Sequence, residues 1–346
     1  MKKYMFLFLL LLFPINTYAL DSARSSIVMD MDSGRVLYQN NTHDKRLIAS
    51  ITKIMTALIT LENTDVNRRV KVGKEVLKMY GSNIYIEVGE KITVRDLLYG
   101  MILRSGNDAA LVLAINTAGS EKSFVKMMNA KAKEIGMKNT IFKNPHGLDE
   151  ETRNISTAYD MAKLSRYTYN TQELYRQISK SKKYTTRTKG KTYIWTNRND
   201  LLNRYKYTTG GKTGYTPKAG RTFVSTATKN GLHLTIVTLD DDNQYDTHEY
   251  LYEKTFSKYK KYRIVNKKSF RINKKLFNKE VYIKEDFSYP LTSSERDEVK
   301  KIIRIDMKDN YSQKNQVGVL CIKLNNKIIK KIPIYLKKKK RLFNLF

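Results

Sequence analysis

Between residues 26 and 239, apolar residues recur first at every second position, then at the helical spacing of about 3.6, and then again at every second position. This order of strand, helix and strand patterns restricts the possible folds more than any other feature of the sequence. Short apolar runs at 26–28 and 36–38 flank an Asp/Ser/Gly turn, and runs at 222–227 and 232–239 flank a Lys-Asn-Gly turn. Both patterns are typical of β-hairpins. We therefore predict an α+β fold in which the two ends of the domain form an antiparallel sheet that carries a helical cluster.

Capping residues and helical spacing locate the expected helices of this cluster. The clearest begins at Ser120, because Phe124, Met128 and Ala132 share one face before Gly136 ends the pattern. The other helices are expected over 51–61 after Ser50, over 97–103 after a Thr93 cap, from Asp108 onward, and from Ser156 to residue 164.

The composition shifts near residue 259, which predicts a second domain in this chain of 346 residues. Residues 261–346 hold 24 basic and 8 acidic side chains, which is +16 of the total formal charge of +32. Apolar runs at 281–283, 317–324 and 328–336 favour strands, the last two joined by an Asn-Asn turn. We expect a small, mostly β domain over 259–336 and a basic, apolar tail over 337–346.

The N-terminal residues have the layout of a secretory signal. Lys2 and Lys3 precede an apolar run over 4–13, and Ala19 offers a small residue at a cleavage point. The alternative, a buried N-terminal strand or helix, would leave no polar face toward water. The sequence thus predicts a signal peptide over 1–19, a domain over 20–258, and export to the outer face of the cytoplasmic membrane or the cell wall. Export disfavours nucleic acid as a partner despite the positive charge.

The residues that commonly hold metals are few and scattered. Cys321 is the single cysteine, and the four histidines (His43, His146, His233, His248) form no His-Glu-x-x-His pattern. We expect no metal and no organic cofactor.

Ser50 and Lys53 form a Ser-x-x-Lys tetrad at the start of an expected helix. Residues three apart share a helix face, so the Lys53 amine can reach the Ser50 hydroxyl and, when desolvated, take its proton. The tetrad alone is a poor signal, since the chain repeats it at Ser123, Ser179 and Ser257.

Two further motifs follow Ser50 in the chain. Ser105-Gly106-Asn107 alone is compatible with a helix-to-helix turn, and Lys212-Thr213-Gly214 alone with a strand end. Taken in this order, the three motifs resemble those of the penicillin-recognising serine enzymes, the penicillin-binding proteins and serine β-lactamases. Other stretches resemble the low-molecular-mass D-alanyl-D-alanine carboxypeptidases: residues 47–49, 144–149, 157–160, 197–199 and 211–220. The resemblance implies a penicillin-binding-protein or β-lactamase-like domain over about 20–262.

The resemblance also implies catalytic roles. Ser50 attacks the carbonyl between two D-alanines, and Lys53 acts as its base. Ser105 relays a proton to the leaving D-alanine, and Asn107 holds Lys53 and the substrate amide.

The implied binding roles fall on the later motif. Lys212 adds positive potential, Thr213 donates to the terminal carboxylate, and Gly214 lets the substrate lie against the strand as an added strand. The backbone N–H groups of Ser50 and Tyr215 form the oxyanion hole.

Three other residues are candidate substrate contacts. The resemblance places His146 near the site, where it helps position the deacylating water, although a surface histidine is the alternative. Family members carry an arginine after the strand that follows the Lys-Thr-Gly strand, but residues 240–250 contain none. His248 is the cationic candidate there, and Arg198 or Arg221 are the other residues that could bind the carboxylate.

The sequence therefore predicts a serine-type D-Ala-D-Ala carboxypeptidase that trims peptidoglycan stem peptides and is inhibited by β-lactams. A D,D-endopeptidase, a β-lactamase, and a non-catalytic wall-binding or membrane-binding protein remain alternatives. The basic cluster at 337–341 beside apolar residues is typical of contact with an anionic membrane surface, with a solvated terminus as the alternative.

Overall fold

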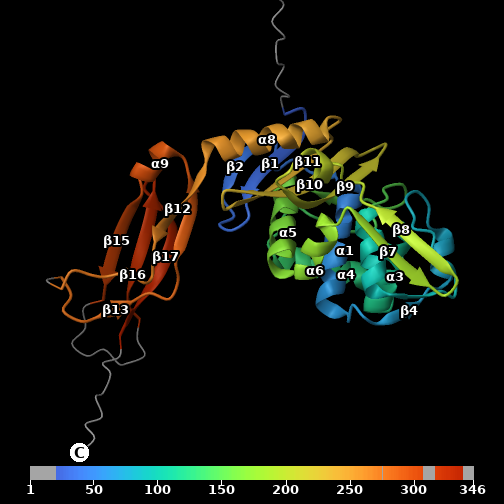
Figure 1. Ribbon diagram of the computed structural model, residues 1–346, viewed down its shortest axis with the longest axis horizontal. Helices are drawn as coiled ribbons and strands as arrows, with labels where there is room; N and C mark the ends of the chain where they lie inside the picture. Colours follow the sequence, from blue (N-terminus) through green and yellow to red (C-terminus); the bar gives the residue numbers. More distant parts are fainter. Residues whose placement is uncertain (1–20, 275, 307–315, 338–346) are drawn as a thin grey trace, which may run out of the picture.

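The computed structural model describes residues 21–274, 276–306 and 316–337, which form the two units coloured in Figure 1. The expected signal peptide and residues 338–346 of the expected tail lie outside these ranges. Within them, no helix has the length and apolar character needed to cross a membrane.

The larger unit is built on a five-stranded antiparallel sheet with the order β2-β1-β11-β10-β9. Its strands are β1 (Ser25–Asp30), β2 (Val36–Asn40), β9 (Thr208–Thr216), β10 (Gly220–Lys229) and β11 (Leu232–Leu239). Ser25 pairs with Leu239, so the first strand joins the last strand of the domain. This pairing confirms the prediction that the two ends of the domain close one sheet.

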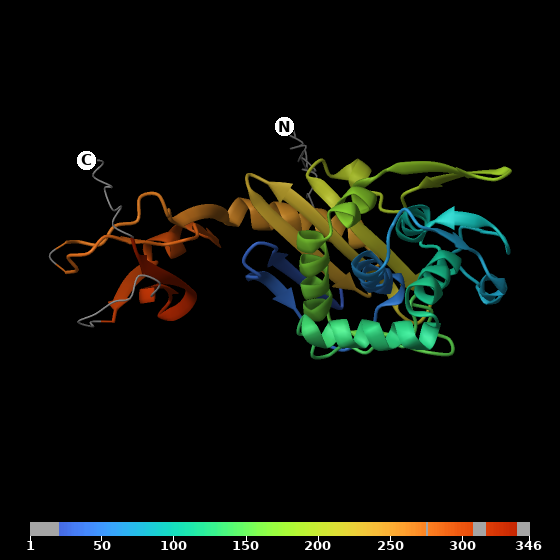
Figure 2. The ribbon, with the colours of Figure 1, turned by 90° about the horizontal axis from the view of Figure 1, so that it is seen from below.

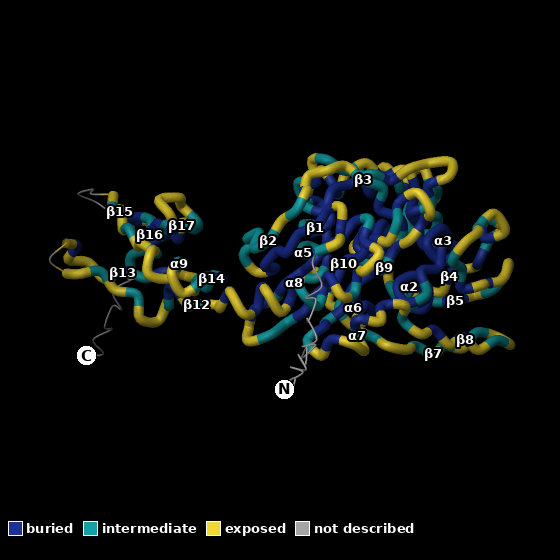
Figure 3. The backbone as a smooth tube through the Cα atoms, turned by 90° about the horizontal axis from the view of Figure 1, so that it is seen from above, coloured by how far each residue is buried: buried dark blue, intermediate teal, exposed yellow. Residues whose placement is uncertain are grey.

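The sheet is covered on both faces, as Figures 1 and 2 show. On one face, α8 (Gln244–Lys258) packs Leu251 and Tyr252 against alternate strand residues such as Val28 and Ile236. On the other face, residues such as Ile27 pack against the helical cluster. Because successive strand residues point to opposite faces, all six residues of β1 are buried (Figure 3).

Side-chain caps fix the starts of several cluster helices. Thr93, Ser120 and Thr157 each accept a backbone N–H from the third residue of the helix that follows. The helices are α1 (Lys53–Asn63), α2 (Val94–Leu103), α3 (Asn107–Ala118), α4 (Glu121–Glu134), α5 (Ala158–Thr171), α6 (Glu173–Lys180) and α7 (Leu201–Arg204), with the 3-10 helices η1 (Ala49–Thr52) and η2 (Lys74–Lys78).

Short two-stranded sheets complete this unit. They pair β3 (Arg46–Leu47) with β6 (Ile155–Ser156), β4 (Arg69–Lys71) with β5 (Lys91–Thr93), and β7 (Lys183–Thr188) with β8 (Lys191–Thr196).

The smaller unit is mostly β and lies to one side of the first (Figure 1). A two-stranded sheet of β12 (Lys260–Val265) and β14 (Phe287–Leu291) accompanies a four-stranded sheet in the order β13-β17-β16-β15. The latter comprises β13 (Val281–Tyr282), β15 (Lys300–Ile305), β16 (Gln316–Leu324) and β17 (Lys327–Leu336), and α9 (Ser293–Asp297) is the short helix. A separate apolar core that includes Leu320 and Ile332 holds these strands together.

Arg35, the residue immediately before β2, joins the two units. Its guanidinium donates to the Pro290 carbonyl at 2.6 Å and to both carboxylate oxygens of Glu295. The same group lies over the rings of Tyr259 and Tyr289, 5.4 and 5.2 Å from their centroids. A bidentate ion pair between two aromatic rings has one favoured geometry, so Arg35 fixes the contact between the units.

Two predicted helix starts differ from the structure. Ser50 lies within η1 and α1 begins only at Lys53, because Ala49 has a left-handed φ of 45° that tightens the turn. The cap of α5 is Thr157, whereas Ser156 belongs to β6.

Candidate active site

The turn that carries Ser50 lies between the sheet and the helical cluster. Thr222 on β10 donates from Oγ1 to the Ile48 carbonyl at 3.0 Å, and so fixes the turn against the sheet. Ser50 is the partly exposed residue of a buried stretch, since Ala49, Ile51 and Thr52 are all buried. Its hydroxyl is therefore presented to solvent from a rigid base.

Lys53 is fully buried one turn after Ser50, and three oxygen atoms surround its amine. Its Nζ lies 3.0 Å from Ser50 Oγ, 2.7 Å from Asn107 Oδ1 and 2.5 Å from the His146 carbonyl oxygen. Burial lowers the pKa of Lys53 well below its usual value, and the positive charge of Lys212 lowers it further. The local environment thus favours the neutral amine, which is the basic form.

Asn107 is held by backbone groups on the other side. Its Nδ2 donates to the Tyr80 carbonyl at 2.7 Å, which turns Oδ1 toward Lys53. Ser105 lies in the turn between α2 and α3 with a left-handed φ of 64°. This conformation brings Ser105 to the same cavity as Ser50.

The strand β9 passes directly against the Ser50 turn. A Cβ atom at Gly214 would lie 2.8 Å from the Ser50 backbone nitrogen and 2.5 Å from Thr222 Oγ1. Glycine is therefore required there by space. Lys212 is buried on this strand, and burial followed by the charge of Arg198 lowers its pKa to about 7. Its Nζ donates to the Thr213 carbonyl at 2.6 Å.

A cavity of about 260 Å³ opens above Ser50. Seven of the residues named from the sequence line it: Ser50, Ser105, Arg198, Thr213, Gly214, Tyr215 and Arg221. Arg221 pairs with Tyr215 across β9 and β10, and its guanidinium lies 5.6 Å from the Tyr215 ring centroid. The cavity thus contains a hydroxyl nucleophile and two guanidinium groups.

Ser82, Gln244 and Tyr245 also line the cavity, although no sequence motif indicates them. Ser82 Oγ accepts from Arg198 Nη1 at 2.7 Å, and the Tyr245 hydroxyl donates to the Arg198 carbonyl at 2.9 Å. None of the three belongs to a motif, so the sequence alone offers no signal for them.

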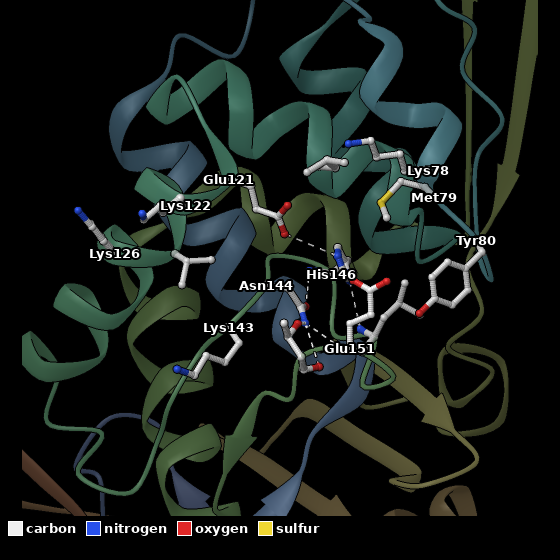
Figure 4. Close-up of a pocket in the computed structure, with 14 residues that line it drawn as sticks. Lys78, Met79, Tyr80, Glu121, Lys122, Lys126, Lys143, Asn144, His146 and Glu151 are labelled. Carbon is white, nitrogen blue, oxygen red and sulfur yellow. Dashed lines mark hydrogen bonds and ion pairs between the residues drawn. The ribbon is translucent and has the colours of Figure 1, made fainter.

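His146 meets the site through its backbone. Its carbonyl accepts from Lys53, while its ring points toward Glu121 in a neighbouring cavity of about 590 Å³, as Figure 4 shows. Nδ1 accepts from the Leu148 N–H at 3.1 Å, and Nε2 lies 3.8 Å from Glu121. Burial, with a smaller contribution from Lys53, lowers the ring pKa to about 3. The imidazole is therefore neutral and does not line the Ser50 cavity.

His248 does not lie in the site, which contradicts its expected role as a carboxylate ligand. It is completely buried on α8, with Nδ1 2.6 Å from Ser225 Oγ and Nε2 3.1 Å from Thr238 Oγ1. Both ring nitrogens are thus engaged, and burial lowers the pKa well below the usual value. A neutral, enclosed imidazole offers no positive charge to a substrate.

The described residues contain no group of three or more His, Cys, Asp or Glu side chains arranged to hold a metal ion. The chemistry available at Ser50 is that of a hydroxyl, an amine of lowered pKa and nearby cationic groups.

A family model described as D-alanyl-D-alanine carboxypeptidase (peptidase S11) matches residues 17–243. The chain belongs to this carboxypeptidase family. A second model, the C-terminal domain of penicillin-binding protein 5, matches residues 250–340. These matches confirm the family, the fold class and the serine hydrolase activity that the sequence of this chain predicts.

Individual relatives agree with the assignment of this S11 carboxypeptidase. D-alanyl-D-alanine carboxypeptidase DacF of Bacillus subtilis is 32% identical over 330 residues, covering 90% of this chain and 84% of that protein. A D-alanyl-D-alanine endopeptidase of Pseudomonas aeruginosa is 35% identical over 226 residues, covering 64% of this chain and 72% of that protein. The crystal structure of penicillin-binding protein 5 from Haemophilus influenzae superposes with a TM-score of 0.76 at 25% identity, covering 92% and 97% of the two chains.

Proposed function

We propose that the protein removes the terminal D-alanine from peptidoglycan stem pentapeptides through an acyl-enzyme on Ser50. One observation carries this proposal: the buried Lys53 amine lies 3.0 Å from Ser50 Oγ, and Ser50 lines a cavity together with residues of both other motifs. The same arrangement supports acylation by β-lactams, which mimic the D-Ala-D-Ala end.

The hydrogen bonds around Lys53 support its role as the base. A neutral amine has two N–H groups and one lone pair. The Asn107 and His146 oxygens accept the two N–H groups, so the lone pair is directed toward the Ser50 hydroxyl. Proton transfer to Lys53 accompanies formation of the bond between Ser50 Oγ and the carbonyl carbon.

Breaking the amide bond requires a proton on the leaving D-alanine nitrogen. Ser105 lines the cavity together with Ser50, and its hydroxyl is the proposed relay from Lys53 to that nitrogen. The backbone N–H groups of Ser50 and Tyr215 are the proposed oxyanion donors, because Gly214 allows β9 to approach the Ser50 turn closely.

The terminal carboxylate of the substrate is assigned to Thr213, Arg198 and Arg221. Both arginines line the cavity with Thr213, and a guanidinium binds a carboxylate through two parallel hydrogen bonds. This assignment replaces His248, and Lys212 contributes positive potential from its buried position behind Thr213.

The proposed site of action is the outer face of the cytoplasmic membrane or the cell wall. The signal-like residues 1–19 support export, and the basic residues 337–341 support contact of the tail with anionic lipid. Cosedimentation with phosphatidylglycerol vesicles, compared with a chain that lacks residues 338–346, tests the membrane contact. Equal binding of both chains would contradict it.

Intact mass after penicillin treatment, with peptide mapping, tests the nucleophile. The expected result is one penicilloyl adduct on Ser50 and none in Ser50→Ala. Ser123→Ala is the matched control, because Ser123 and Lys126 repeat the tetrad spacing on the exposed face of α4. An adduct that persists in Ser50→Ala rejects the assignment.

Substrate assays separate the related activities. The carboxypeptidase releases D-alanine from a diacyl-D-Ala-D-Ala peptide and hydrolyses nitrocefin slowly. Rapid nitrocefin hydrolysis without D-alanine release would favour a β-lactamase, and cleavage of cross-linked stem peptides alone would favour an endopeptidase like the Pseudomonas relative.

A further inference from the structure

Asp108 follows the Ser105-Gly106-Asn107 motif and belongs to none of the roles above. It is buried at the start of α3, and its carboxylate accepts hydrogen bonds from three successive loop amides. The Ile84, Tyr85 and Ile86 N–H groups donate to it at 3.0, 2.8 and 3.3 Å.

This arrangement is a backbone nest occupied by a side chain of the same protein. Successive amides converge on one anion only when the backbone alternates its conformation. Tyr85 has a left-handed φ of 59°, which is strained for a bulky residue and persists only where contacts impose it. Residues 83–87 lie in no helix or strand, so no sheet or helix hydrogen bonds stabilise this conformation.

The loop held in this way is attached to the active site at three points. The Tyr80 carbonyl accepts from Asn107 Nδ2, and the Ser82 carbonyl accepts from the Asn107 backbone N–H, both at 2.7 Å. Ser82 Oγ accepts from Arg198 at 2.7 Å and lines the cavity with Ser50.

We propose that Asp108 is a positioning residue: its carboxylate holds the loop over 80–86 as the wall of the cavity and thereby places Ser82 against Arg198. The substrate carboxylate then meets an arginine whose orientation is already fixed. This inference rests on the proposed function, because it assigns Arg198 to substrate binding.

Amide hydrogen exchange tests whether Asp108 stabilises the loop, and the experiment needs no substrate. The amides of residues 84–86 should exchange slowly in the wild type and faster in Asp108→Asn, which loses the negative charge and replaces one of the two acceptor oxygens with an NH₂ group that cannot accept. Asp30→Asn is the matched control, since Asp30 is also buried and accepts the Ser33 N–H at 2.8 Å in a distant hairpin. Fast exchange in the wild type, or unchanged exchange in Asp108→Asn, overturns the proposal.

Steady-state kinetics test the consequence for Ser82 and Arg198. In Asp108→Asn, KM for a diacyl-D-Ala-D-Ala peptide should rise about fivefold, while Asp30→Asn lowers thermal stability without changing KM. In a Ser82→Ala background the further rise should be less than about twofold, because coupled residues are not additive. An unchanged KM, or a full additional rise in the double variant, rejects the positioning role.

The two failures are distinguishable. A wild type that forms no adduct on Ser50 and releases no D-alanine rejects the proposed function. In that case the exchange rates of residues 84–86 still decide whether Asp108 holds the loop.

Discussion

Lys53 Nζ lies 2.7 Å from Asn107 Oδ1, although 54 positions separate the two residues. The contact joins α1 to α3 at the point where the Ser50 turn meets the cavity. Two separate elements therefore determine where the amine lies. The pKa of Lys53 is lowered mainly by burial and next by the charge of Lys212 on β9. Residues of all three motifs therefore determine the position or the protonation of this amine.

Replacing Lys212 by Gln should shift the pH dependence of acylation. Acylation requires neutral Lys53, and the charge of Lys212 helps to keep the Lys53 pKa low. Removing that charge raises the Lys53 pKa, so the acidic limb of the acylation rate at saturating penicillin moves to higher pH. The exposed Lys71→Gln variant should keep the wild-type profile. A shift to lower pH would contradict this electrostatic role.

Lys212 should also make substrate binding weaken above neutral pH. Its pKa is about 7, and the protonated form supplies the positive potential behind Thr213. As pH rises through this value, the charge is lost and KM for the D-Ala-D-Ala peptide increases. Measuring KM between pH 6 and 9 checks the expectation. In Lys212→Gln, KM should be higher than that of the wild type at pH 6 and should not change with pH over this range.

Gly214→Ala should reduce acylation strongly while the chain still folds. The added methyl group would lie 2.8 Å from the Ser50 nitrogen and 2.5 Å from Thr222 Oγ1, so β9 or the turn must move. Overpacking of this kind typically costs about 1–3 kcal/mol, and a displaced oxyanion donor slows acylation by about 10²-fold or more. Stopped-flow acylation by penicillin and circular dichroism measure the two effects. Wild-type acylation would show that the strand has room to adjust.

Sequence patterns locate the sheet and the nucleophile for different physical reasons. The hairpins of β1–β2 and β10–β11 follow from the alternation of apolar residues around a turn, which is a local signal. Ser50 and Lys53 emerge only because three short motifs occur together. One of these motifs alone would not distinguish Ser50 from Ser123, which lies on an exposed part of α4.

The features that sequence patterns do not locate depend on distant contacts. The β7–β8 hairpin has an exposed face with residues such as Ile194, which obscures its alternation. Ser82 reaches the cavity because backbone amides bind Asp108, and no residue pattern encodes such contacts. His248 comes shortly after the end of a strand in the sequence, but it lies on the face of α8 that packs into the core.

Arg35→Ala should loosen the contact between the two units without changing catalysis. The change removes hydrogen bonds to Pro290 and Glu295 and leaves the Glu295 carboxylate without this partner, at a cost of about 1–3 kcal/mol. Limited proteolysis should cut the segment around Tyr259 faster, while acylation of Ser50 stays at the wild-type rate. The control is Arg24→Ala, whose exposed side chain makes only a 3.9 Å ion pair with Asp240. Equal proteolysis of both variants would show that Arg35 does not hold the units together.

His248 should make the protein less stable in acid. Its pKa in the folded chain is depressed well below 6.5, so below about pH 6.5 the unfolded chain takes up a proton that the folded chain excludes. Stability from this residue is therefore full above the unfolded pKa and is lost as pH falls, by up to about 1.4 kcal/mol per pH unit. Chemical denaturation between pH 4.5 and 7.5 should give His248→Gln a shallower acid slope by about one proton, together with lower stability at pH 7.5, because Ser225 and Thr238 lose ring partners. His233→Gln is the contrasting control: its hydrogen bond with Asp32 raises the pKa, so its contribution is present below the unfolded pKa and is lost as pH rises. An acid slope that is unchanged in His248→Gln would show that other groups control the pH dependence of folding.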